Sequence, residues 1–164
     1  MSAALQVLSF VDAPVVTGPA RGLVHLGRQL PASVRLHVAI LRGRGAPPAP
    51  RLDELAGGGL TVHELPELGS FDPTLLARAV LLARRIGAGV VQSHSYKPHV
   101  LALAVRAATG APWIGHHHGW TAENDKVRLY HRVDGLTMPR ADRVVAVAES
   151  ARDIVVREGV PAGR

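Results

Sequence analysis

The sequence contains no cysteine among its 164 residues, which excludes a disulfide framework and thiolate chemistry and favours a reducing compartment. Aromatic residues are also scarce: the sequence contains two Phe, two Trp and two Tyr. The core must therefore consist of Leu, Val, Ala and Ile. With 47% hydrophobic residues the chain is not disordered, and its length suits one well-buried domain.

Long apolar runs are missing as well. The first run, residues 5–11, is too short for a signal peptide or a membrane span, so we expect a cytoplasmic protein. The segment 72–86 has the pattern of a helix with one apolar face and three arginines. Such a helix can lie on an anionic membrane surface, which would make the protein peripheral to the inner membrane face. The favoured interpretation is a helix that covers a sheet.

Lysine is rare, and the net charge of +6 rests on 17 arginines and two lysines. A positive surface favours anionic ligands such as sugar nucleotides, phospholipid headgroups or nucleic acid. Nucleic acid is the least favoured of these, because the arginines are scattered and no aromatic residues interleave with them. We therefore expect no nucleic-acid partner.

Phosphate-binding motifs are absent from the sequence. Gly43 and Gly45 begin a G-x-G pattern, but Pro48 occupies the third glycine position and no helix is predicted to follow. This departure argues against a dinucleotide-binding fingerprint, and there is no P-loop. No cofactor is expected.

Short apolar runs alternate with helical patterns along the whole chain. The predicted strands are 5–11, 34–41, 60–65, 89–92, 112–116 and 143–147, and the predicted helices are 19–30, 72–86, 98–108, 124–138 and 150–158. Asp72 with Pro73 marks one helix start, and Ser150 with Asp153 is spaced as a capping pair for the last helix. This alternation predicts one three-layer α/β domain over 1–164, a Rossmann-like fold with a parallel sheet of six or seven strands.

Two polar clusters follow neighbouring predicted strands. Residues 93–97 read Ser-His-Ser-Tyr-Lys, and residues 116–120 read His-His-His-Gly-Trp, with Thr121 and Glu123 close behind. Doubly wound sheets bind ligands at the carboxyl ends of their strands. We expect His94, Lys97 and His118 to line one crevice there, with Gly18 nearby.

The histidines permit more than one interpretation. His116 and His118 would share one face of a strand end, and His94 could add a third metal ligand, but no recognised ligand spacing is present, so no metal is predicted. His116 and His117 fit packed strand residues, whereas Gly119 lets a ligand approach the backbone beside His118. Tyr96 and Lys97 lie at the start of a predicted helix, where they could bind an anionic or hydroxyl-rich ligand. The alternative for Lys97 is a solvated surface charge.

Three segments together resemble the family-4 retaining glycosyltransferases. Residues 90–97 resemble that family's histidine-bearing strand end, 114–121 its Thr-x-His-Gly strand end, and 140–150 its Arg-Ala-Asp-Arg-Val-Val-Ala-Val-Ser-Glu stretch. They occur in the family's order and at its separations. The resemblance covers about residues 88–160, and the first 70 residues match only in outline.

The resemblance implies one half of a GT-B enzyme, in which two Rossmann-like domains face a cleft. The N-terminal domain holds the sugar acceptor and the C-terminal domain holds the nucleotide-sugar donor. By position, His118 would be the catalytic residue near the transferred sugar, with Gly119 beside it. The other substrate-binding positions would be Tyr96, Lys97 and His94, Glu149 after the sixth strand, and Thr17, Gly18 and Arg21 in the first loop.

Two departures from the family pattern shape the functional hypothesis. Ala148 stands where the family has serine, and the chain ends at Arg164, where the family enters the domain whose paired glutamates hold the donor. We therefore expect an acceptor-binding half of a hexosyltransferase for a cell-envelope or exopolysaccharide glycan, inactive by itself. The alternatives are a non-catalytic binding module of the same fold and a metal-dependent hydrolase that uses the histidines.

Overall fold

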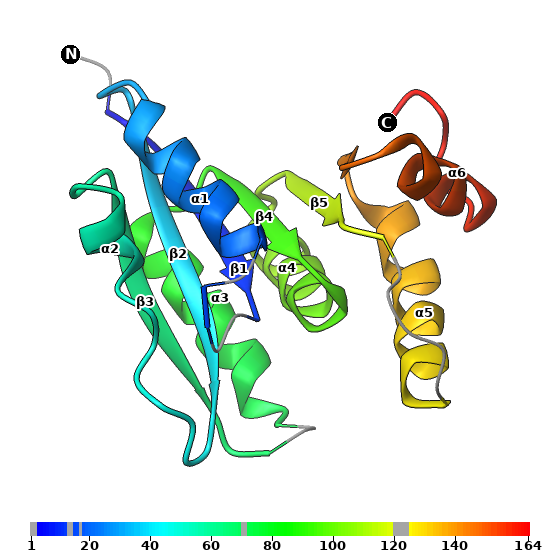
Figure 1. The fold of residues 1–164 in the computed structure, drawn as a ribbon, viewed down its shortest axis with the longest axis horizontal. Helices are drawn as coiled ribbons and strands as arrows, with labels where there is room; N and C mark the ends of the chain where they lie inside the picture. Colours follow the sequence, from blue (N-terminus) through cyan, green and yellow to red (C-terminus); the bar gives the residue numbers. More distant parts are fainter. Residues whose placement is uncertain (1–2, 13–14, 17, 70–71, 120–124) are drawn as a thin grey trace.

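The computed structural model describes residues 3–12, 15–16, 18–69, 72–119 and 125–164, with the side chains of 125–129 left aside. Six parallel strands form one sheet in the order β3-β2-β1-β4-β5-β6 (Figure 1). They are β1 (Leu5–Val11), β2 (Val34–Gly43), β3 (Leu60–Glu67), β4 (Val90–His94), β5 (Trp113–His117) and β6 (Arg143–Ala146). The predicted parallel α/β fold is therefore confirmed.

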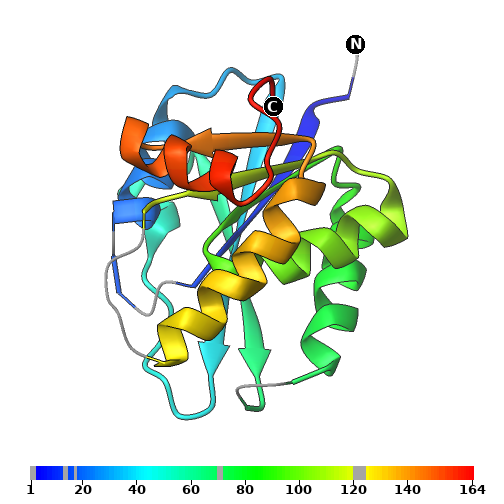
Figure 2. The same cartoon turned by 90° about the vertical axis from the view of Figure 1, so that its right-hand side faces the viewer.

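Helices cover both faces of this sheet, as Figures 1 and 2 show. They are α1 (Gly18–Gln29), α2 (Leu52–Leu55), α3 (Thr74–Ile86), α4 (Tyr96–Thr109), α5 (Asp125–Thr137), the 3-10 turn η1 (Met138–Arg140) and α6 (Glu149–Arg157). Side chains of β1 alternate between two apolar clusters: Leu8 and Phe10 meet α3 and α4, whereas Val7 and Val11 meet α1 and α2. Because both faces are buried, five of the seven residues of this strand are apolar.

The strand order reverses between β1 and β4, which are neighbours in the middle of the sheet. Val11 of β1 pairs in register with His94 of β4, and His94 pairs with His116 of β5. The carboxyl ends of the three central strands thus lie side by side. This edge of the sheet, at the switch in strand order, is where doubly wound folds place ligands.

Helix α3 covers the sheet, as the favoured interpretation of residues 72–86 predicted. Leu75, Ala79 and Ala83 are buried in the core. The helix begins at Thr74, with Pro73 at the position before it, two residues later than predicted, and the Asp72 carboxylate accepts the Thr74 amide hydrogen at 2.9 Å. No helix among the described residues is long and apolar enough to cross a membrane.

The predicted capping of the last helix is wrong. Helix α6 begins at Glu149 after an extended Ala148 (φ −154°, ψ 161°), and no side chain caps its start. Ser150 therefore lies inside the first turn, beyond the position from which a hydroxyl reaches the free amides. Helix α2 was not predicted at all, because four residues are too few to show helical periodicity.

Asp142, within the segment that resembles the family, joins three elements. Its carboxylate accepts two hydrogen bonds from Arg106 of α4, at 2.7 and 2.9 Å, and one from the Trp113 amide at the start of β5, at 2.8 Å. The hydrogen bonds from Arg106 and then Trp113 hold the pKa of Asp142 well below its usual range. This part of the motif therefore stabilises the fold.

Candidate functional site

A chain of hydrogen bonds runs from the middle of β1 to the end of β5. Ser9 Oγ lies 3.1 Å from His94 Nε2, and His94 Nδ1 lies 3.1 Å from His118 Nε2. The His116 ring stacks on His94 with ring centroids 4.3 Å apart. The structure thus brings His94 and His118 together, as predicted, and adds Ser9, which sequence reasoning missed.

These histidines are uncharged at neutral pH. Burial, followed by the neighbouring His116 and His118, lowers the pKa of His94 to about 2. Burial and then His118 lower the pKa of His116 to about 4, and burial lowers the pKa of His118. A neutral imidazole carries one N–H and one free lone pair, so each ring can pass on a hydrogen bond but cannot provide a positive charge.

A second polar chain lies behind the first, between β5 and α4. Trp113 Nε1 can only donate, so Ser93 Oγ accepts its hydrogen at 2.7 Å. The Ser93 hydroxyl then donates to His99 Nδ1, also at 2.7 Å, which leaves the His99 hydrogen on Nε2. His99 Nε2 lies 3.8 Å from Asp134 Oδ1 of α5. These hydrogen bonds thus orient the Nε2–H of His99 toward the carboxyl group of Asp134.

Asp134 has an unusual environment for an aspartate. Burial, and then the charge of Glu158, raise the pKa of Asp134 to about 7. Burial, and then His117 and His116, lower the pKa of His99 to about 3, so His99 does not supply a compensating positive charge. Near neutral pH the Asp134 carboxyl group can therefore gain or lose a proton.

Both polar chains lead to a cavity of about 220 Å³ between the ends of β4 and β5 and helices α4 and α5. Its lining residues are Ser95, Tyr96, His99, His116, His117, His118, Gly119, Tyr130, His131 and Asp134. Three of the predicted site residues, Tyr96, His118 and Gly119, are among them. The Tyr96 ring stacks on Tyr130 with centroids 3.7 Å apart.

Ser95, at the start of α4, holds a strained backbone in this cavity. Its φ is 108° and its ψ is 168°, a region that L-residues other than glycine rarely occupy. Ser95 joins His94, which is paired with β1 and β5, to α4, which begins at the next residue. Such strain at a cavity is typical of functional sites.

Lys97 of α4 forms an ion pair with a carboxylate of β3. Its ammonium group forms hydrogen bonds of 2.7 and 3.0 Å with the carboxylate of Glu67, which is largely buried at the end of β3. Lys97 does not line the cavity. Sequence reasoning missed Glu67 because β3 was predicted to end at residue 65, whereas the strand continues past Pro66 and ends at Glu67. A carboxylate near a strand end was the available signal.

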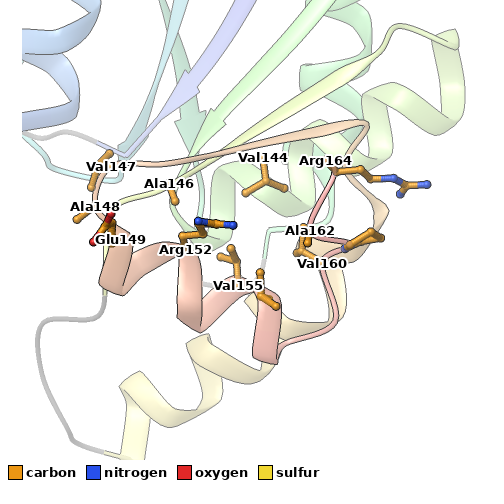
Figure 3. A pocket seen from close by; sticks show the side chains of 12 residues that line it. Val144, Ala146, Val147, Ala148, Glu149, Arg152, Val155, Val160, Ala162 and Arg164 are labelled. Carbon is orange, nitrogen blue, oxygen red and sulfur yellow. The ribbon is translucent and has the colours of Figure 1, made fainter.

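The remaining predicted residues lie away from this cavity. Gly18 and Arg21 are exposed on the first turn of α1, and neither lines the cavity. Glu149 lines a different cavity of about 370 Å³ between β6 and α6, where Figure 3 shows it beside Arg152. Thr17, Trp120, Thr121 and Glu123 lie outside the described residues.

The predicted packing of the histidine triplet is partly as expected. His117 is buried, and His116 is half-buried against His94. Within the described part of the chain, no group of three or more His, Asp or Glu side chains is arranged to hold a metal ion. His94 Nδ1 and His118 Nε2 instead face each other at hydrogen-bonding distance.

Comparison with solved structures identifies the fold. HepE from Anabaena, solved with UDP, matches with a TM-score of 0.76 at 15% identity, over 97% of this chain and 42% of HepE. A glycosyltransferase from Rickettsia africae matches with a TM-score of 0.70 at 16% identity, over 98% of this chain and 41% of that one. A putative UDP-N-acetylglucosamine 2-epimerase from Listeria monocytogenes reaches 0.65 at 15% identity, over 98% of this chain and 43% of that one.

These matches assign the domain to the Rossmann-like half of a GT-B architecture, and the chain spans about two fifths of the matched structures. Because an epimerase shares the fold, fold alone does not decide the activity. A comparison with curated proteins gives no match. The family model for Glycosyltransferase Family 4, however, matches residues 16–164, which is nearly the whole sequence. The chain therefore belongs to Glycosyltransferase Family 4.

Proposed function

We propose that this chain is the acceptor-binding domain of a glycosyltransferase that uses a sugar nucleotide and transfers a hexose. The observation that carries the proposal is the match to Glycosyltransferase Family 4 over residues 16–164. The HepE structures with UDP and with UDP-glucose support a uridine nucleotide sugar as the donor. The structures that match are more than twice as long as this chain, which supports placing the donor site on a further domain.

In this proposal His118 is the catalytic residue beside the transferred sugar. It lines the cavity at the carboxyl edge of the sheet with Gly119 and Tyr96. Because it is uncharged, it acts by hydrogen bonding to oxygen atoms and holds the acceptor where the sugar arrives. Retaining transfer also needs groups that stabilise the departing phosphate, and we assign those to the donor-binding domain.

The acceptor in this proposal belongs to a cell-envelope or exopolysaccharide glycan, and the enzyme works at the cytoplasmic face of the membrane. The net charge of +6 supports contact with an anionic surface. Gly18, Arg21, Lys97 and Glu149 follow β1, β4 and β6, and in the proposal they contact substrate across the cleft. His94 contacts His118 and not the substrate in this proposal.

A transfer assay tests this division of roles. The chain is incubated with radiolabelled UDP-glucose and short exopolysaccharide fragments, both alone and fused to a donor-binding domain of the same family. We expect no turnover by the chain alone, because the two substrates are not held together. We expect turnover by the fusion and a loss of about a hundredfold on His118→Ala.

The matched control is Ser150→Ala in the same fusion, because Ser150 is exposed and makes no capping bond. Transfer by the chain alone would contradict the proposed division between two domains. Full activity of the His118→Ala fusion would contradict the role of His118 while leaving the family assignment untouched.

A further inference from the structure

Ser9 is an unusual residue for its place in the fold. It lies in the middle of β1, in the run Val7-Leu8-Ser9-Phe10-Val11, and none of its surface is exposed. A buried hydroxyl is unfavourable unless it forms a hydrogen bond. Within the described residues, the only hydrogen-bond partner of the Ser9 side chain is His94 Nε2, at 3.1 Å.

The Ser9 hydroxyl sets the direction of the hydrogen bonds that follow. If it donates to His94 Nε2, that nitrogen carries no hydrogen and His94 Nδ1 carries one. His94 Nδ1–H then donates to His118 Nε2, at 3.1 Å. His118 in turn keeps its hydrogen on Nδ1, because a neutral ring has one N–H. Each of the three polar groups is satisfied in this arrangement.

The opposite direction leaves one group unsatisfied. If His118 Nε2–H donated to His94 and His94 Nε2–H donated to Ser9, the Ser9 hydrogen would have no acceptor within the described residues. An unpaired buried donor is disfavoured by a factor of about ten to a hundred. The first direction is therefore the dominant one.

The surroundings keep the rings of this chain uncharged. The ring of His116 stacks on His94 at 4.3 Å, and His118 stacks at 5.4 Å. His99 of α4 also acts on His94 by charge, so two neighbouring rings could not both carry an added proton without repelling each other. His94 itself is 6% exposed. Burial and mutual repulsion thus favour one hydrogen per ring.

We propose that Ser9 and His94 are positioning residues that hold His118 as the neutral Nδ1–H tautomer. His118 Nδ1–H is then a hydrogen-bond donor for an uncharged oxygen of the ligand, such as a sugar hydroxyl, and offers no positive charge to a phosphate. The ligand class rests on the proposed function, whereas the tautomer rests only on this hydrogen-bond chain.

Histidine ring ¹⁵N spectra of the chain test the proposal directly, because protonated and unprotonated ring nitrogens have well-separated shifts. Signals are assigned with His94→Gln and His118→Gln. In the unmodified chain we expect His94 and His118 to carry hydrogen on Nδ1. In Ser9→Ala we expect His118 to lose most of this preference, with about a tenfold or larger change in the tautomer ratio. Ser9→Thr, which keeps the hydroxyl, retains the preference.

An unmodified chain with the His118 hydrogen on Nε2 overturns the proposal, even if Ser9→Ala does not fold. An unchanged tautomer in folded Ser9→Ala overturns it as well. Neither result depends on glycosyl transfer. If the fusion shows no transfer while the tautomers are as expected, the proposed function fails and the positioning chain stands.

Discussion

Replacing Ser93 by alanine removes the central link of the Trp113–Ser93–His99 chain. The Ser93 hydroxyl accepts from Trp113 Nε1 and donates to His99 Nδ1, both at 2.7 Å. Ser93 and Trp113 are fully buried and His99 is 1% exposed, so water cannot replace the hydroxyl in the native packing. Ser93→Ala should therefore destabilise the fold strongly for so small a change.

The magnitude follows from the two groups that lose their partner. The indole N–H of Trp113 and the Nδ1 nitrogen of His99 each lose their hydrogen bond to Ser93, and an unsatisfied buried polar group costs about 1–3 kcal/mol. The expected loss in the free energy of unfolding is about 2–6 kcal/mol. Since domains of this kind are stable by about 5–15 kcal/mol, this is a large fraction of the total.

Urea denaturation, followed by circular dichroism and by Trp fluorescence, measures the loss. The matched control is Ser150→Ala, because Ser150 is exposed and the start of α6 has no side-chain cap. That control should stay within about 0.5 kcal/mol of the unmodified chain. Ser93→Cys, which keeps a weak donor and acceptor, should fall between the two alanine variants.

A loss below about 1 kcal/mol for Ser93→Ala, with an unchanged dependence on urea, would refute this reasoning, because two orphaned buried groups cannot cost so little. A loss in Ser150→Ala equal to that in Ser93→Ala would refute it too.

Four further predictions concern stability. The first concerns three histidines, whose pKa is near 6.5 in the unfolded chain and is lowered on folding to about 2 for His94, 3 for His99 and 4 for His116. Their contribution to the free energy of unfolding is therefore complete above about pH 6.5 and is lost as the pH falls. Urea titrations at several pH values should show a loss of up to about 1.4 kcal/mol per pH unit for each histidine. Asp134 has the opposite effect, because its pKa is raised from 3.8 to about 7 on folding. Its contribution to the free energy of unfolding is lost as the pH rises from about 4 to 7, and Asp134→Asn should flatten that part of the plot of stability against pH. Ser95→Gly should stabilise the fold by about 1 kcal/mol, measured as a higher urea midpoint, because it relieves the positive φ; a destabilised variant would contradict the strain argument. Arg106→Ala should lower the urea midpoint only slightly, because its ion pair with Asp142 is partly exposed; a loss no larger than that of exposed Arg35→Ala would show that the pair contributes nothing.

The fold could be predicted because its signals are local. Each strand contains a short apolar stretch, and breaks such as Gly87 and Gly110 end the helices before the next strand; both glycines adopt left-handed backbone conformations at those ends. The polar clusters at 93–97 and 116–119 were also visible, since their residues follow strands directly. Periodicity and punctuation are therefore sufficient for the order of the elements.

The partners of the site residues could not be predicted in this way. Ser9 meets His94 across 85 positions, and Glu67 meets Lys97 across 30, only because the sheet order places β1 beside β4 and brings the end of β3 to the same edge. Strand order depends on how the helices pack on the two faces of the sheet, and a short stretch of sequence does not contain that information. Glu149 illustrates the same limit, because the edge position of β6 separates it from the cavity that contains His118.

The two polar chains are better explained by function than by stability. Buried polar groups of this kind are often replaced by apolar residues without loss of stability, so two serines and two histidines buried in β1, β4 and α4 are not needed to fill a core. Both chains instead end at the same cavity, one at His118 and the other at Asp134. Each fixes which ring nitrogen carries hydrogen before a ligand arrives. Preset donors and acceptors need no rearrangement on binding, which is what the proposed acceptor site requires.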